Sequence, residues 1–483
     1  MNRPLNPLAE QSKARMDEIL RLQRAAQERH GPPSAALRKD RLNRAISMLL
    51  THKDDLVAAM KADFGARSPD MTLLTDIVGA VGPMKYARDH LGAWMKPQRR
   101  KVSPPALAVL GGRSELRFQP KGVVGVISPW NFPVQLACDA VAGAFAAGNR
   151  IMLKPSEFTP ETSGLLAQLF TLFFDDDEIA VFTGGADVGA AFAALPFDHL
   201  IFTGATSVGR HVMRAAAENL TPVTLELGGK SPVVVGRSAG LEKAAARIMA
   251  GKTMNAGQVC LAPDYVLAPS ESVEGFVGAA TQAVAKMFPT IKENPDYTSV
   301  INQRHYDRLQ NLLADARAKG AKIVEINPAN EDFSQQEHRK IPPTLILDAT
   351  DDMGVMQEEI FGPLLPVRRY AAFGETIAEI NRRPRPLALY YFGEDAAESE
   401  AILEHTTSGG VTINDVIFHF TQDDLPFGGV GPSGMGAYHG HDGFLEFSHK
   451  KAIYRQTSSE LIAMFRPPYG EAFRKQVEAR LKP

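Results

Sequence analysis

The stretch KGVVGVISPWNFPVQLACDAVAGAFAAGNRIMLKPSE, residues 121–157, decides the fold. Its apolar run at 123–127 is typical of a buried strand, and a second such run follows at 151–154. Between them, residues 133–147 are typical of a helix, because the segment begins at a proline and ends before Gly148. Strand, helix and strand in this order form a unit whose two strands run parallel. We therefore expect a parallel sheet in this part of the chain.

The same alternation of strand and helix continues downstream. Helices are expected at 160–174, 187–194 and 207–217, and strands at 179–182, 199–203 and 223–227. A second set follows residue 228, with helices at 241–254, 271–288 and 304–319 and strands at 264–268, 322–326, 344–348, 364–370, 387–392 and 410–414. Repeated alternation predicts the α/β class, with parallel sheets covered by helices on both faces. A chain of 483 residues is too long for one core, so two or three domains are expected.

In parallel sheets of this kind, ligands bind beyond the carboxyl ends of the strands. Lys154, Thr203, Gly204 and Glu226 all lie at the ends of predicted strands. The sequence therefore places candidate binding residues along one edge of the first sheet.

The segments outside these sheets have other patterns. Residues 7–29 and 34–62 look like amphipathic helices, expected on the outside of the first domain. Residues 99–118 contain two short strand-like runs around Gly111-Gly112, which predicts a β-hairpin arm and an oligomer contact. The end of the chain, 456–483, reads as a polar helical tail whose apolar residues are too few for a membrane anchor: Leu461, Ile462, Met464 and Phe465.

Composition limits the classes of partner. The chain is 44% hydrophobic and 22% charged with a net charge of −2, as in an ordinary globular protein. Nothing is basic enough to indicate nucleic acid or an anionic membrane as the main partner. The N-terminus has no apolar run typical of a signal peptide, and no stretch is long enough to span a bilayer. Two cysteines are too few for a disulfide framework, which favours a reducing, cytoplasmic setting.

Three motifs match a ligand-binding pattern without its context. Residues 429–434 satisfy G-x-G-x-x-G, but they follow no strand, open no helix and contain Pro432. Gly228 to Ser231 resembles the end of a P-loop, but Thr224 stands where the first glycine is required. The pair His439 and His441 has no further ligands at metal spacing, so no metal site is expected.

Cys260 lies in a short segment between a predicted helix and a predicted strand. The helical pattern ends before Gly257, and Pro263 prevents a new helix from starting at once. A cysteine on such a rigid loop suits a nucleophile, whereas the alternative is a small buried apolar residue. Cys138, on the apolar helix 133–147, is expected to be core packing.

Two further residues complete a possible reaction centre. Asn131 follows a strand and carries an amide that could donate to an oxyanion, although an asparagine here could also cap a loop. Glu226 ends an apolar strand, where partial burial would raise its pKa and let it activate water; it could equally be a surface or salt-bridged residue. These residues are candidates for parts of one reaction, the oxidation of an aldehyde by a thiol. That reaction needs a nucleophile, oxyanion donors, a hydride acceptor and a base.

Six short strings together resemble the aldehyde dehydrogenase superfamily over about residues 35–455. In order they are PWNFP (129–133), KPSE (154–157), FTGATSVG (202–209), LELGGKSP (225–232), GQVC (257–260) and EEIFGP (358–363). The string APDY after Cys260 and PFGGVGPSGMGAYHG (426–440) look like the class 3 branch, and within it most like the bacterial coniferyl aldehyde dehydrogenases. Residues 418–420, Phe-His-Phe, fall where this resemblance places a substrate funnel.

The resemblance implies a role for each matching residue. Cys260 would attack the aldehyde, Asn131 would help to hold the oxyanion, and Glu226 would activate the hydrolytic water. The residues implied in binding NAD, with NADP possible, are Trp130, Lys154, Glu157, Thr203, Gly204, Gly209, Glu359 and Phe361. Glu157 favours NAD, because a carboxylate repels a 2′-phosphate. Two positions depart from common family versions, since Ala205 offers no polar side chain to phosphate and Phe132 offers no hydroxyl near Asn131.

The implied fold has two Rossmann-like parallel-sheet domains and a small β oligomerisation arm. The expected organisation is an NAD(P)-binding domain (1–98 and 119–227), a catalytic domain (228–422), an oligomerisation arm (99–118 and 423–455) and the helical tail (456–483). The implied activity is NAD(P)-dependent oxidation of an aromatic or medium- to long-chain aldehyde to the acid, by a homodimer. Alternatives are a CoA-acylating relative, which Glu226 argues against, a non-catalytic NAD-binding relative, and a cysteine hydrolase without a cofactor, which would leave Lys154, Glu157 and Glu359 without a role.

Overall fold

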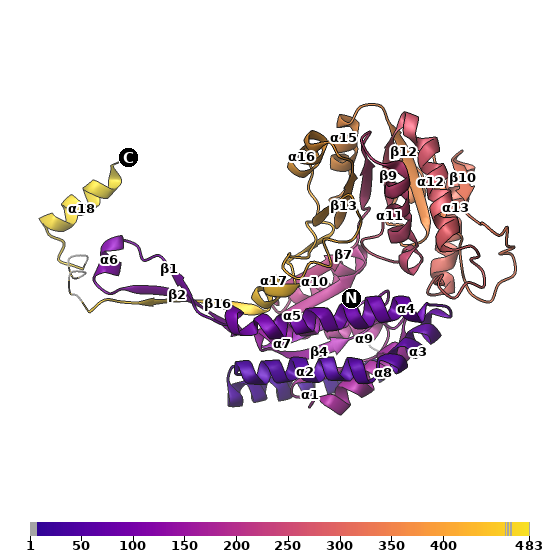
Figure 1. Ribbon diagram of the computed structural model, residues 1–483. Helices are drawn as coiled ribbons and strands as arrows, with labels where there is room; N and C mark the ends of the chain where they lie inside the picture. The colour runs from indigo at the N-terminus through magenta and orange to yellow at the C-terminus, as the bar shows by residue number, and fades with distance from the viewer. Residues whose placement is uncertain (1–6, 459, 461–462, 464–465, 483) are drawn as a thin grey trace.

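Two sheets of mainly parallel strands form the two halves of the molecule in the computed structural model, which describes residues 7–458, 460, 463 and 466–482 (Figure 1). The first sheet has the strand order β15-β7-β6-β3-β4-β5, and only β15 runs antiparallel to its neighbour. Its strands are β3 (Val123–Ile127), β4 (Arg150–Lys154), β5 (Ile179–Val181), β6 (His199–Gly204), β7 (Val223–Leu227) and β15 (Gly434–Met435).

Alternate residues of the first sheet enter different cores, as the two-residue period of a strand requires. Val124 and Leu153 pack on one face with α2, α5, α7 and α8, whereas Val123 and Met152 pack on the other with α1, α9 and α10. The helices of this half are α1 (Pro7–His30), α2 (Ala35–Thr51), α3 (Lys53–Phe64), α4 (Pro69–Thr72), α5 (Gly79–Trp94), α7 (Gln135–Ala147), α8 (Pro160–Phe173), α9 (Ala186–Ala193) and α10 (Thr206–Ala217), with a π-helical turn at Leu73–Val78.

The N-terminal helices differ from the prediction in two respects. The segment expected as one helix at 34–62 is two helices, α2 and α3, because His52 leaves the helical conformation at φ −108° and ψ 20°. The helical stretch 69–94, which includes α5, was not predicted. Both differences concern helices that cover the sheet rather than the strands themselves.

The second sheet has the order β10-β11-β12-β9-β8-β13-β14, and only β10 is antiparallel to its neighbour. Its strands are β8 (Pro232–Val235), β9 (Tyr265–Pro269), β10 (Lys322–Glu325), β11 (Thr344–Leu347), β12 (Leu364–Tyr370), β13 (Ala388–Phe392) and β14 (Gly410–Ile413). Its helices are α11 (Leu241–Thr253), α12 (Val273–Met287), α13 (Gln303–Ala318), α14 (Gly354–Gln357), α15 (Gly374–Arg382) and α16 (Ala396–His405), with a short 3₁₀ turn at Ser270–Ser272. Strand β8 is central but was not predicted, because it is only four residues long and begins with a proline. The predicted α/β fold with two Rossmann-like sheets is confirmed.

A third, antiparallel sheet projects from the body as an arm (Figure 1). It consists of β1 (Gln98–Arg100), β2 (Arg113–Pro120) and β16 (Ser448–Arg455) in the order β1-β2-β16. The strand-like run at 107–110 was misread, since α6 (Pro105–Val109) occupies this connection and Pro104-Pro105 favours a helix start. From the predicted arm segment 423–455, only β16 joins this sheet, because β15 pairs with β7 and α17 (Gly440–Glu446) packs near α7.

Beyond the arm lies α18 (Glu471–Leu481), at the end of the chain (Figure 1). The apolar tail residues Leu461, Ile462, Met464 and Phe465 lie outside the described residues. Within the part of the chain that is described, no helix combines the length and apolarity needed to cross a bilayer.

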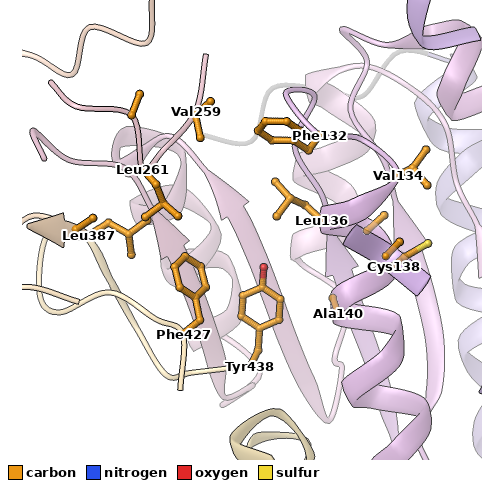
Figure 2. Close-up of a cluster of buried hydrophobic side chains, with 14 of the residues drawn as sticks. Phe132, Val134, Leu136, Cys138, Ala140, Val259, Leu261, Leu387, Phe427 and Tyr438 are labelled. Carbon is orange, nitrogen blue, oxygen red and sulfur yellow. The ribbon is translucent and has the colours of Figure 1, made fainter. Parts of the chain in front are cut away.

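One apolar core runs continuously from the first half to the second. Phe132 and Leu136, at the start of the α7 region, belong to the same cluster as Val259 and Leu261, which flank Cys260 (Figure 2). The two halves therefore meet around the segment that carries the candidate nucleophile.

The turn between α11 and this segment has a strained backbone. Asn255 and Ala256 have φ of 48° and 52°, and Gly257 has φ of 75°. A Cβ on Gly257 would lie 2.3 Å from the carbonyl oxygen of Gly362. Only glycine fits both the conformation and the space.

We predict that Gly257→Ala lowers the free energy of unfolding by about 2 kcal/mol or more, because the new methyl group collides with backbone in a left-handed conformation. Gly278→Ala is the matched control, since it lies in α12 with open space around its Cα and should stabilise the helix by about 0.5–1 kcal/mol. Thermal unfolding of both variants checks the difference, and equal melting temperatures would contradict it.

Candidate active site

The segment that carries Cys260 is fixed by one buried side chain. Gln258 Nε2 donates to the carbonyl oxygens of Asn255 and Ser299, both at 3.0 Å, and its Oε1 accepts from the backbone N–H of Ile301 at 2.9 Å. Gln258 is fully buried, so these bonds are shielded from water. Cys260 therefore follows directly on a rigid anchor, as the sequence analysis expected.

The thiol of Cys260 is uncharged in the free protein. Burial raises the pKa of Cys260 to about 12, and the carboxylates of Glu359 and Glu226 act in the same direction. A thiol with this pKa is a poor nucleophile near pH 7 until its proton is taken. Glu226 and Glu359 are therefore the two acids whose charges act on the thiol of Cys260.

Glu226 is a buried carboxyl group without a partner. It lies in β7 opposite Thr203 of β6 on one side and Gly434 of β15 on the other. Its side-chain oxygens have no hydrogen-bond partner among the described residues, and burial, with a smaller effect from Glu446, raises its pKa well above the usual range. This is a group that can hold a proton near neutral pH. Gly434, the last glycine of the segment 429–434, thus belongs to the edge strand beside Glu226.

Asn131 is held against the loop that carries the cysteine. Its side-chain Nδ2 donates to the carbonyl oxygen of Gln258 at 3.1 Å. Its own carbonyl oxygen accepts from Asn255 Nδ2 at 3.0 Å and from Arg67 at 2.9 Å. The amide has a second N–H, which is the kind of donor that an oxyanion needs. The structure thus brings Asn131, Glu226 and Cys260 together.

Sequence analysis missed the ion pair that supports Asn131. Arg67 and Asp76 form a salt bridge of 2.6 Å with both side chains fully buried. Asp76 also accepts the backbone N–H groups of Val134 and Gln135, where α7 begins. No pattern in the sequence distinguishes this arginine from a surface residue, but Asn255 could have been suspected, because asparagine takes a positive φ more readily than most other residues.

The residues predicted to hold the adenosine half of the cofactor lie along one sheet edge. Lys154, at the end of β4, donates to Glu157 at 2.9 Å. Thr203 and Gly204 end β6, and α10 begins two residues later, so the backbone N–H groups of its first turn face the sheet edge. Gly209 is buried in α10, where a Cβ would lie 2.7 Å from the side chain of Leu227.

The residues predicted to hold the nicotinamide half form a second group. The rings of Trp130 and Phe361 are 5.3 Å apart, and Phe361 has the left-handed φ of 49°. Burial and the charge of Asp264 raise the pKa of Glu359 to about 8, and its Oε1 has no partner among the described residues. A Cβ on Gly228 would lie 1.9 Å from Glu359 Oε2, so glycine is needed for this approach. A buried acceptor without a donor fits the hydroxyl groups of a ribose, and the residues present fit NAD(P).

The P-loop-like lysine has a structural role beside this group. Lys230 donates to the carbonyl oxygens of Val355 and Glu358, at 2.6 and 2.9 Å, and contacts Asp264. Arg308 contacts the carbonyl oxygens of Glu359 and Ile360. These contacts fix the backbone that presents Glu359.

Cys138 and the predicted substrate funnel were also singled out in the sequence. Cys138 is fully buried in α7, which confirms its role in packing. Of the predicted funnel residues, Phe418 is 56% exposed and Phe420 packs edge-on against Phe427 at 4.8 Å.

Known proteins share extensive sequence similarity with this chain. Residues 2–453 match the model of the aldehyde dehydrogenase family. The chain is 60% identical over 484 residues to a probable coniferyl aldehyde dehydrogenase of Caulobacter vibrioides, covering 100% of both chains. It is 55% identical over 443 residues to a coniferyl aldehyde dehydrogenase of a Pseudomonas species, covering 92% of this chain and 91% of the relative.

Solved structures of aldehyde dehydrogenases have the same fold as this chain. The structure of the substrate-bound state of Staphylococcus aureus AldH superposes with a TM-score of 0.90 at 35% identity, covering 97% of this chain and 99% of that one. Other solved aldehyde dehydrogenases with a TM-score of 0.82 contain NAD⁺. This chain therefore belongs to the aldehyde dehydrogenase family.

Proposed function

We propose that the enzyme oxidises an aromatic aldehyde of the coniferyl type to the carboxylic acid, through a covalent intermediate on Cys260 that Glu226 helps to hydrolyse. The observation that carries this proposal is the buried, unpartnered carboxyl group of Glu226, whose charge acts on the thiol of Cys260. The aromatic preference is supported by the names of the relatives and by the rings of Phe418 and Phe420. Medium- and long-chain alkyl aldehydes are the second substrate class.

The first step is attack of the Cys260 sulfur on the aldehyde carbon. The thiol proton has to leave, and the raised pKa of Glu226 makes this carboxylate a suitable acceptor. The new C–S bond turns the carbonyl oxygen into an oxyanion, which the amide of Asn131 and the backbone N–H of Cys260 would stabilise. NAD(P), when bound, supplies the acceptor for the hydride, so that a thioester remains on Cys260.

The second step is hydrolysis of this thioester. Glu226, once deprotonated, takes a proton from a water molecule, whose oxygen then bonds to the acyl carbon. The C–S bond breaks, the acid leaves, and Cys260 regains its proton. Because Glu226 can activate water, hydrolysis would compete with transfer of the acyl group to CoA.

The residues around the cofactor site have separate tasks in this proposal. Lys154 and Glu157 would bind the adenosine ribose, and Glu359 the nicotinamide ribose, with Trp130 and Phe361 as the aromatic wall beside it. Thr203, Gly204 and Gly209 would shape the approach to the pyrophosphate at the start of α10.

We also propose a cytoplasmic homodimer that assembles through the arm. Both cysteines are free thiols, which suits a reducing compartment. The arm projects from the body and exposes apolar side chains, with Val109 at 88% and Tyr454 at 45% exposure. Such side chains on a projecting antiparallel sheet are typical of a contact with a second copy.

Substitution of the two central residues should separate the two steps. We expect Cys260→Ala to abolish formation of reduced cofactor, since no covalent intermediate can form. Glu226→Gln should form at most one equivalent of reduced cofactor per active site, and form it more slowly, because the acceptor of the thiol proton is missing. Its steady-state rate should be reduced about 10²- to 10⁴-fold, because the base for hydrolysis is missing as well. Rapid mixing with absorbance detection of the reduced cofactor checks both, and turnover by Cys260→Ala would refute the assignment.

The pH dependence gives an independent control for the same assignment. A base acts in its deprotonated form, and the pKa of Glu226 is raised, so the steady-state rate should fall as pH falls through that raised value. An ordinary glutamate would be ionised throughout the neutral range and would leave the rate flat there. The residual rate of Glu226→Gln should lack this dependence.

Cofactor choice should depend on one carboxylate. We expect Glu157→Gln to raise kcat/KM for NADP about tenfold, because the 2′-phosphate no longer meets a negative charge. Glu161→Gln, an acidic residue in the first turn of α8, is the matched control and should leave the ratio of NAD to NADP unchanged. Steady-state kinetics with both cofactors measure the ratio, and an unchanged ratio in Glu157→Gln would exclude the role.

Assembly through the arm is tested by light scattering coupled to size-exclusion chromatography. Wild type should elute with about twice the mass of the 52.5 kDa chain. Val109→Asp should shift the protein towards the monomer, because it places a charge in the proposed apolar contact. Leu172→Asp changes a 73% exposed side chain on α8, outside the arm, and should remain dimeric. A monomeric wild type would end the proposal.

A further inference from the structure

Asp139 and His439 form a buried polar pair that the catalytic steps do not use. Asp139 lies in α7, whose residues are all buried, and its side chain is 1% exposed. His439 precedes α17 and is 7% exposed. Neither oxygen of Asp139 nor Nε2 of His439 has a hydrogen-bond partner among the described residues. Buried polar groups are normally paired, so this pair lacks a partner that the protein does not provide.

The distance within the pair suits a single bridging oxygen. His439 Nε2 and Asp139 Oδ2 are 3.7 Å apart, which is too long for a direct hydrogen bond. One hydroxyl oxygen at about 2.8 Å from both atoms would satisfy them together. Burial raises the pKa of Asp139 well above its usual range and lowers the pKa of His439 to about 3, so both favour an uncharged partner over an ion.

Aromatic rings surround the pair. The ring of His439 lies 4.9 Å from the rings of Phe420 and Phe427, and 4.6 Å from that of Tyr438. Rings at such distances form an apolar, planar-sided environment in which another aromatic ring packs well. The polar pair is therefore joined to a surface suited to an aryl group.

Tyr438 connects this surface with the reaction centre. Burial raises the pKa of Tyr438 well above its usual range, and the carboxylates of Asp139 and Glu226 and the thiol of Cys260 act in the same direction. Figure 2 shows the Tyr438 ring beside Phe427, between Leu261 and the α7 residues Leu136 and Ala140. Leu261 adjoins Cys260, and Ala140 adjoins Asp139. An aryl aldehyde bound at Cys260 would thus have Asp139 and His439 within the same enclosed region.

We infer that Asp139 and His439 bind the phenolic hydroxyl of a 4-hydroxyaryl aldehyde. This hydroxyl can donate to Asp139 and accept from His439, or the reverse, whereas an ether oxygen at the same position cannot donate. The inference rests on the proposed oxidation of an aryl aldehyde and adds the feature by which such a substrate is distinguished from its ethers and from alkyl aldehydes.

The test compares 4-hydroxy-3-methoxycinnamaldehyde with its methyl ether, 3,4-dimethoxycinnamaldehyde, in wild type, Asp139→Leu and Asp139→Asn. Wild type should favour the phenol about 10- to 100-fold in kcat/KM, as expected for a hydrogen bond to a group that can ionise. Asp139→Leu should bring the ratio close to one while it leaves the rate with the ether within about threefold. Asp139→Asn, which keeps hydrogen-bonding groups, should retain an intermediate ratio.

Asp442→Asn is the matched control, because it changes a nearby acid in α17 that belongs to neither pair nor reaction centre. It should keep the wild-type ratio. Thermal unfolding of each variant verifies the fold, and Asp139→Asn provides the decisive comparison if Asp139→Leu fails to fold. A wild-type ratio near one, or an equal loss with both substrates in Asp139→Asn, would overturn the inference and leave the pair as a site for a bridging water.

Equilibrium binding separates this inference from the proposed activity. In Cys260→Ala, which cannot form the covalent intermediate, the phenol should bind about 10- to 100-fold more tightly than the ether, and Asp139→Leu added to this variant should remove the difference. Absence of turnover in wild type with this binding difference intact would refute the activity and support the binding site. Turnover in wild type with equal affinities for phenol and ether would support the activity and refute the binding site.

Discussion

The buried ion pair between Arg67 and Asp76 is the interaction on which the reaction centre depends. It joins the loop before α4 to the first residues of α7 and to the carbonyl oxygen of Asn131. Removal of one partner from a buried pair typically costs 3–5 kcal/mol, because the other charge is left uncompensated. Asn131 is hydrogen-bonded to the segment that carries Cys260. Loss of the ion pair would therefore displace both the oxyanion donor and the nucleophile.

The reaction centre also contains buried acids that are not needed to stabilise the fold. Glu226 and Glu359 have unpartnered oxygens and raised pKa values, and both hold the thiol of Cys260 in its protonated form. Burial of unpaired acids costs stability in the free protein. Natural proteins accept such costs where chemistry or binding needs them. The raised pKa of Cys260 disfavours the thiolate, which is the form that reacts with oxidants.

The strands that carry the site residues could be predicted from the sequence. Strand β8 and helix α6 could not. Strands β7 and β12 were predicted with correct limits, because Pro222 and Gly228 bound the first and Pro363 precedes the second. Strand β8 begins with a proline directly after Lys230 and Ser231, so it was not recognised, and α6 was mistaken for a strand because five residues are too few to show a helical period. Cys260, Asn131 and Glu226 were placed together by resemblance to a family. Arg67 and Asp139 are visible only in three dimensions, since an isolated charged residue carries no local signal of burial.

The edge position of β15 has a consequence for how the enzyme is made. Strand β7 receives its outer neighbour only from Gly434 and Met435, more than two hundred residues further along the chain. Synthesis proceeds from the N-terminus, and domains tend to fold as they emerge. The first half can therefore form most of its sheet early while the edge beside Glu226 stays open to water. A ribosome-bound chain truncated before residue 434 would carry the nucleophile and the base without a closed site, so competence for chemistry is postponed until synthesis is nearly complete.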